Sequence, residues 1–263
     1  MLEIRFSYLS GGKYDTTSHG GSATDRGPVR EVNEDRVLCE DRYGLYVIFD
    51  GVGGHNAGEV AAQIAAETVA GYVARSSGNE DDTWPLGWDP RFSATSNRLR
   101  TAVVLANQRV HLAAQSDPAL LGMATTVAAV LVAGNVVSFA NVGDSRIYRL
   151  DPGPAHALTD DDAATVDQLD AAGERIGSRR ALTRALGADQ DVTPSMAEMP
   201  VPSRMRLLLC SDGLHGVIGL EELDPGAYAG EPREVATRLM NYAIEAGTRD
   251  NVSVLVVDIG ERP

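Results

Sequence analysis

The chain has 263 residues and a formal net charge of −14, with 43% hydrophobic and 23% charged residues. This composition is ordinary for a globular protein, and the negative charge argues against nucleic acid or an anionic membrane as a partner. No apolar run is long enough to span a membrane, and the N-terminal segment lacks the apolar core of a signal peptide. Two cysteines are too few for a disulfide scaffold, so we expect a cytoplasmic protein, and we expect it to be a monomer.

The first half of the chain alternates strand and helix patterns. The segment YGLYVIF (43–49) predicts a buried strand, and apolar residues recur at helical spacing over 54–74. An acidic, turn-rich stretch (76–91) predicts a loop before a second helix over 97–115, for which Ser96 is the candidate cap.

The second half is richer in strand patterns. Residues 125–143 predict two strands joined by a hairpin turn at Gly134-Asn135. Four more elements follow: strands over 145–150, 205–211 and 252–259, and a helix over 231–247. Short turns between neighbouring strands favour antiparallel sheets with helices outside them, which is an α+β layered architecture.

Carboxylates recur in one sequence context. Three aspartates follow an apolar run and touch a glycine: Asp50 beside Gly51, Asp144 beside Gly143, and Asp212 beside Gly213. Asp250 lies in a turn before the last strand, and Asn33-Glu34-Asp35 precedes another strand-like run. Convergent carboxylates would repel one another unless a hard divalent cation such as Mg²⁺ or Mn²⁺ bound between them. Taken singly, each aspartate fits a turn or cap equally well, because Asp-Gly is common in turns.

The glycine-rich segment GVGGHNAG (51–58) does not match the common phosphate-binding motifs. Asn56 stands where GxGxxG needs its third glycine, and no Lys-Ser or Lys-Thr pair of a P-loop follows. A second aspartate two residues after Asp50, as an aspartyl phosphotransferase requires, is missing, and no GxSxG nucleophile elbow is present.

Several motifs occur in a recognisable order along the chain. They are TDRG (24–27), REVNED (30–35), FDGVGGHNAGEVA (49–61), GDSRIY (143–148), LTRALG (182–187), CSDGL (210–214) and RDNVSVLVV (249–257). In this order they resemble the metal-dependent protein serine/threonine phosphatases of the PPM family, the 2C type, in their bacterial form. The resemblance covers about residues 22–259, so we expect residues 1–263 to form a single phosphatase domain with a flap over about 159–187.

The resemblance implies a four-layer α/β/β/α sandwich of two mainly antiparallel sheets, with two Mn²⁺ or Mg²⁺ ions in a cleft at one edge. It implies the following ligands: Asp50 bridging both ions, Asp212 and Asp250 on the first, the Gly51 carbonyl with Glu34 and Asp35 on the second, and Asp144 with Asp212 on a weaker third ion. It also implies that Arg30 grips the substrate phosphate and that Asn251 supports the cluster. Catalysis would rest on Arg30, Asp50 and Asp212, with a water activated between the two ions attacking phosphorus directly.

The chain departs from the family pattern at the expected general acid. Some relatives carry a histidine two residues after the bridging aspartate, where this chain has Val52. His55 is a nearby alternative but fits a loop or cap equally well, and His215 fits a structural role. Within the flap, Arg175, Arg179 and Arg180 either attract a phosphorylated segment or form a solvated basic turn.

The function expected from the sequence is hydrolysis of phosphoserine and phosphothreonine on proteins, opposing a serine/threonine kinase. An alternative is a non-catalytic phosphoprotein-binding or sensor module on the same fold, although such a module would have lost several of the carboxylates. A third reading is an enzyme of the same fold dedicated to one phosphorylated signalling protein.

Overall fold

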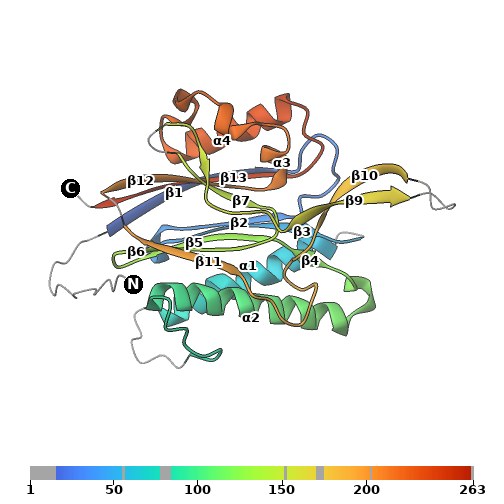
Figure 1. Cartoon of the computed structure of the whole chain (residues 1–263), viewed down its shortest axis with the longest axis horizontal. Coiled ribbons are helices and arrows are strands. Elements are labelled where there is room, and N and C mark those ends of the chain that lie inside the picture. The colour runs from blue at the N-terminus through green and yellow to red at the C-terminus, as the bar shows by residue number, and fades with distance from the viewer. Residues whose placement is uncertain are drawn as a thin grey trace, which may run out of the picture.

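Two antiparallel sheets stack face to face in the computed structural model, and helices cover the outer face of each (Figure 1). The structure describes residues 16–54, 57–77, 84–150, 153–169, 175–201 and 203–261. The predicted α+β sandwich with four layers is confirmed. Among the described residues, no helix is long and apolar enough to cross a membrane.

The first sheet has the strand order β11-β6-β5-β3-β2. Its strands are β2 (Asp35–Glu40), β3 (Leu45–Val52), β5 (Val127–Ala133), β6 (Val136–Val142) and β11 (Ser195–Pro200), and β4 (Ala124–Thr125) pairs with the end of β3. The long helices α1 (Ala57–Ser76) and α2 (Ala94–Ser116) pack on its outer face. Fully buried alanines such as Ala61 and Ala65 let α1 lie close to the sheet.

The second sheet has the order β1-β13-β12-β7-β8. Its strands are β1 (Thr16–Asp25), β7 (Arg146–Arg149), β8 (His156–Ala157), β12 (Arg204–Cys210) and β13 (Val252–Glu261). The amphipathic helix α4 (Pro232–Glu245) and the short helix α3 (Asp212–His215) cover it. Short 3-10 turns complete the connections: η1 (Asp41–Tyr43), η2 (Pro118–Leu120), η3 (Leu220–Glu222) and η4 (Pro225–Tyr228).

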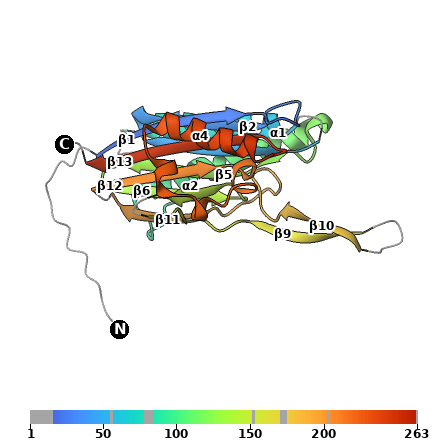
Figure 2. The same cartoon turned by 90° about the horizontal axis from the view of Figure 1, so that it is seen from above.

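A two-stranded hairpin projects from one end of the sandwich (Figure 2). It consists of β9 (Ala163–Leu169) and β10 (Arg175–Leu182), which pair with each other rather than with either sheet. The hairpin lies within the flap predicted over 159–187, and it begins and ends beside the carboxyl end of β3 (Figure 1).

The core between the sheets is apolar and closed. Tyr46 and Ile48 of β3 face Leu207 and Leu209 of β12 and Leu255 of β13, and all five are fully buried. Burial of one such leucine side chain stabilises the fold by about 1.5–3 kcal/mol. This core fixes the positions of the strand ends that carry the site.

The structure corrects several predicted element boundaries by a few residues, and two of these differences have a clear cause. Helix α2 begins three residues earlier than predicted, because Ser93 rather than Ser96 is its cap and accepts a bond from the Ser96 amide. Strand β3 continues to Val52, because β4 pairs with it there, so Asp50 lies inside the strand rather than after it.

Candidate metal centre and active site

A cleft of ≈ 490 Å³ lies at the edge of the sandwich where β3 ends, β12 passes into α3 and β13 begins. Its walls contain seven of the residues predicted for the site: Arg30, Glu34, Asp50, Gly51, Asp144, Asp212 and Asp250. The remaining lining comes from Val52 and Gly53 and from the flap residues Arg180, Ala181 and Leu182. Segments far apart in the sequence therefore meet at one point.

Asp50 lines the cleft, and its main chain is held in place by three hydrogen bonds. The Asp50 amide donates to Thr126 Oγ1 at 3.0 Å, and its carbonyl accepts from the Thr126 amide at 2.9 Å and from Thr125 Oγ1 at 3.0 Å. Asp35 on β2 is its cross-strand partner. Burial, followed by repulsion from Asp35 and Asp212, raises the pKa of Asp50 well above its ordinary value.

Asp35 lies beneath the cleft rather than on its wall. Its side chain is 2% exposed, and Oδ2 accepts a bond from Ser211 Oγ at 2.9 Å, while Oδ1 is buried without a hydrogen-bond partner. Burial raises the pKa of Asp35 to about 7. A role for Asp35 as a direct ligand stays a prediction, and its position suits support of Asp50 and of the start of α3.

Asp212 and Glu34 are also acids whose pKa values are raised by their surroundings. Asp212 is the first residue of α3, and its pKa is raised to about 6 by burial and by repulsion from Asp250 and Asp144. Glu34 Oε1 is buried without a partner, and burial raises the pKa of Glu34 as well. Carboxylates that are crowded and unpartnered in this way are stabilised by a bound cation.

Two glycines are required by close backbone approach. A Cβ on Gly51 would lie 2.2 Å from the Gly58 carbonyl oxygen, at the point where α1 begins. A Cβ on Gly213 would lie 1.9 Å from the Asn251 carbonyl oxygen. The Asp-Gly pattern in the sequence thus reflects strand ends packed against neighbouring backbone, which brings the aspartates together.

Asn251 ties the loop that carries Arg30 and Glu34 to the start of β13. Its Oδ1 accepts from the Glu34 amide at 2.9 Å, and its Nδ2 donates to the carbonyls of Arg26 at 2.8 Å and Val32 at 2.9 Å. Arg30 Nη2 donates to Asp250 Oδ2 at 2.7 Å, so the guanidinium already lies at the cleft wall.

The flap contributes a second arginine to the cleft. Arg180 forms an ion pair with Asp161 and lies 3.7 Å from Asp144 Oδ2 through its Nε atom. Arg146 also bonds Asp161, at 2.8 Å. Arg175 instead pairs with Asp167 within the hairpin and does not line the cleft. The side chain of Arg179 lies outside the described residues.

The histidines that the sequence raised as candidates do not face the cleft within the described part of the chain. His215 Nε2 donates to the Asp144 carbonyl at 2.9 Å, and burial lowers its pKa to about 4, so it is neutral and structural, as predicted. His55 lies outside the described residues. Val52, at the position where some relatives carry a histidine, lines the cleft.

The donor set fits a hard divalent cation. It consists of carboxylate oxygens and the backbone of Gly51. Two buried carboxylate oxygens, Glu34 Oε1 and Asp35 Oδ1, lack hydrogen-bond partners. The acids also repel one another, which raises the pKa of Asp50. Across the described ranges, no three acidic, histidine or cysteine side chains are already grouped so that they could hold a metal ion, as a closed cage of protein ligands would be. A closed cage is not required, because Mg²⁺ keeps several waters and is usually held by one or two carboxylates.

Hydroxyl residues that support the site were not predicted from the sequence. Thr125 and Thr126 hold the main chain of Asp50, Ser145 bonds Thr126 through its hydroxyl at 2.7 Å, and Ser211 bonds Asp35. The available signal was two consecutive threonines before the apolar run VAAVLVA, since buried hydroxyls there must find partners.

Comparison with known proteins agrees with the fold. The family model for protein phosphatase 2C matches residues 28–245. The chain is 35% identical over 242 residues to the serine/threonine protein phosphatase PstP of Mycobacterium tuberculosis, covering 90% of this chain and 44% of PstP. It is 31% identical over 255 residues to the serine/threonine phosphatase Stp of Listeria welshimeri, covering 91% of this chain and 95% of Stp.

A solved structure shares the architecture. The catalytic domain of PstP, in complex with two manganese ions, aligns with a TM-score of 0.74 and 30% identity, covering 94% of this chain and all of that one. A family model that spans most of the chain, together with these relatives, defines the class: the chain belongs to the protein phosphatase 2C family.

Proposed function

We propose that the chain is a metal-dependent protein phosphatase that hydrolyses phosphoserine and phosphothreonine on proteins. The observation that carries the proposal is the convergence of Asp50, Asp144, Asp212 and Asp250 with Arg30 in one cleft. Relatives named serine/threonine phosphatases, among them Stp and PstP, support the activity and the class of substrate. A non-catalytic binding module would have no need for crowded acids that raise one another's pKa values.

The metal would be Mn²⁺ or Mg²⁺, and we propose a site for two ions. PstP is described in complex with two manganese ions, which supports this number. In this chain Asp50, Asp212 and Asp250 would hold the ions with Glu34 and the Gly51 carbonyl, and Asp144 offers a place for a weaker third ion. Bound there, the ions would supply Lewis acidity and a nucleophilic water at neutral pH.

The chain's own residues would bind and orient the phosphate. Arg30 and Arg180 both line the cleft, so both guanidiniums can reach the oxygens of a phosphate bound there. Arg30 would give up its bond to Asp250 to donate to those oxygens, and donation to charge that develops in the transition state lowers the barrier. Asn251 holds Arg30 in place by fixing its loop.

The described cleft offers no histidine to protonate the leaving alkoxide, because Val52 occupies the expected position. We propose that solvent supplies this proton. The natural substrates would be phosphorylated proteins of a signalling pathway that contains a serine/threonine kinase, with the enzyme located in the cytoplasm and acting as a monomer.

Hydrolysis of a phosphothreonine peptide tests the proposed activity. Purified protein should release phosphate with Mn²⁺ and stop when EDTA is added. Arg30→Lys keeps the charge but loses the planar fork, and it should lower kcat/KM by about 10²-fold. The conservative Arg204→Lys, at the exposed first position of β12, is the matched control and should retain full activity. Phosphate release that persists in EDTA, or none with any divalent ion, would reject the proposal.

A further inference from the structure

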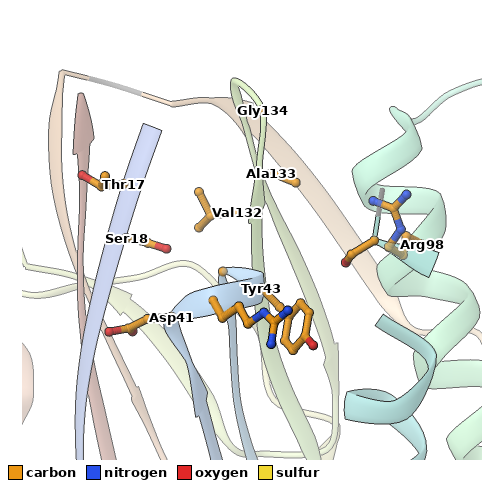
Figure 3. A pocket seen from close by; sticks show the side chains of 11 residues that line it. Thr17, Ser18, Asp41, Tyr43, Arg98, Val132, Ala133 and Gly134 are labelled. Carbon is orange, nitrogen blue, oxygen red and sulfur yellow. The ribbon is translucent and has the colours of Figure 1, made fainter. Parts of the chain in front are cut away.

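A second hollow lies at the opposite end of β3 from the catalytic cleft, and the proposed reaction does not use it (Figure 3). Its volume is ≈ 470 Å³, and it is bounded by β1, η1, the β5–β6 turn and the facing ends of α1 and α2. Gly44 lines it, and six residue steps of extended chain lead from Gly44 to Asp50, which places the two sites about 20 Å apart.

Two arginines line this hollow, and neither forms an ion pair with a carboxylate within the part of the chain that the structure describes. Arg98 reaches it from α2, and its Nε atom is fully buried without a hydrogen-bond partner. The Arg42 guanidinium stacks on the ring of Tyr43, 5.4 Å from the ring centroid, so its N–H edge is left to bond a ligand. A buried cationic donor without a partner is costly, and an anion would remove that cost.

The one acid that lines the hollow is already engaged. The carboxylate of Asp41 accepts bonds from His19 Nδ1 at 2.8 Å, from the Gly20 amide at 2.9 Å and from Tyr46 Oη at 2.9 Å. His19 and Gly20 belong to β1 and Tyr46 to β3, so these donors hold Asp41 against both strands. The positive charge of Arg42 and Arg98 is therefore left for a ligand, in a protein whose net charge is −14.

Hydroxyl groups complete the lining. Figure 3 places Arg98 on one side of Ala133 and Gly134, with Thr17 and Ser18 on the other side. Tyr46 Oη gives its single proton to Asp41, so Ser18 Oγ donates its own proton to Tyr46 Oη at 2.9 Å, and Thr17 is the lining hydroxyl that can donate to a ligand. Planar guanidiniums with a nearby hydroxyl donor suit a tetrahedral oxyanion such as phosphate, which accepts two parallel bonds from one arginine.

We propose that this hollow is a second, non-catalytic phosphate site that binds a phosphate group through Arg98 and Arg42. The group is either free phosphate or the phosphate of a phosphorylated side chain. The site shares no residue with the catalytic cleft, so the proposal stands whether or not the chain is a phosphatase.

Backbone amide NMR of the whole chain tests the site with inorganic phosphate as the probe, in EDTA. The amide signals of Gly44 and Gly134 should move with phosphate concentration. Arg98→Gln should weaken this response at least about tenfold, the loss expected for one charge-assisted pair. Arg109→Gln, which removes the same charge from an exposed position of the same helix, should leave it unchanged. Arg42→Gln provides a second test in case Arg98→Gln does not fold, as judged by circular dichroism.

A phosphoserine peptide and its unphosphorylated form then identify the source of the group. Tighter binding of the phosphopeptide than of inorganic phosphate assigns the site to phosphoproteins, and weaker binding assigns it to free phosphate. The proposal is overturned if Gly44 and Gly134 do not respond, or if Arg98→Gln and Arg109→Gln titrate alike. Movement confined to amides near Gly51 would place binding in the catalytic cleft and would also overturn it.

Discussion

The interior between the sheets and the cleft at their edge are built from the same strands, yet the interior is apolar and the cleft is lined by acids. Ile48 of β3 and Leu209 of β12 are fully buried against apolar neighbours. Two residues after Ile48 comes Asp50, and three residues after Leu209 comes Asp212, both among acids that raise their pKa values. Contacts between the sheets stabilise the fold, whereas the acids in the cleft repel one another.

In this fold, stability depends mainly on the core between the sheets, and the proposed function depends on the cleft. The core supplies the free energy of folding, and it is rigid enough to keep carboxylates close despite their repulsion. In the cleft, that rigidity keeps the acids close together, and a divalent cation bound there would relieve their repulsion. Substitutions in the two regions should therefore affect stability and activity in opposite ways.

The largest effect is expected on activity from Asp212→Asn. The amide keeps the shape of the side chain but removes a proposed metal ligand, so kcat/KM with Mn²⁺ should fall at least about 10³-fold. Phosphopeptide hydrolysis measures the loss, and urea unfolding should show stability equal to or above that of the wild type. Asp191→Asn, on the exposed surface, is the matched control. Wild-type turnover by Asp212→Asn would break the assignment of the cleft.

Leu209→Ala should have the opposite profile. Its side chain is fully buried between the sheets, so the free energy of unfolding should fall by about 2–5 kcal/mol. Activity per folded molecule should stay within a few-fold of the wild type at low temperature. Leu112→Ala, at a leucine that is 67% exposed, should change stability by less than about 0.5 kcal/mol. A similar loss from both variants, measured in urea, would contradict the assigned core.

Asn251 lies between the core and the cleft, so Asn251→Ala should lower both stability and activity. It removes three hydrogen bonds that tie the loop of Arg30 and Glu34 to β13. Stability should fall by about 1–3 kcal/mol, and kcat/KM by about tenfold, because Arg30 loses its fixed position. Urea unfolding and kinetics of the same variant check this. A loss of stability with unchanged kcat/KM would contradict the role of Asn251 in positioning Arg30.

Much of the site was predictable because its signals are local. Apolar runs that end in an aspartate beside a glycine identified Asp50, Asp144 and Asp212, and the order of the motifs indicated the family and the sandwich. Helices α1, α2 and α4 followed from apolar periodicity, with errors of a few residues at their ends.

The remaining features depend on pairing between distant segments, which local patterns do not encode. Strand β1, with the sequence TTSHGGSATD, is too polar and glycine-rich to resemble a strand, and it forms because all ten residues pair with β13. The mostly exposed edge strand β11 was missed for a similar reason. The burial of Asp35, and the support that Thr126 and Ser211 give the site, also arise only when the sheets stack.

Thermal melting of wild type and Asp50→Asn, with EDTA and with Mn²⁺, tests the central claim most directly. In EDTA the variant should be more stable by about 1 kcal/mol, a rise of about 2–4 °C, because one repelling charge opposite Asp35 is gone. Mn²⁺ should raise the melting temperature of the wild type well above its EDTA value and should change that of the variant little. A variant that melts lower than the wild type in EDTA, or that gains as much from Mn²⁺, would contradict the account.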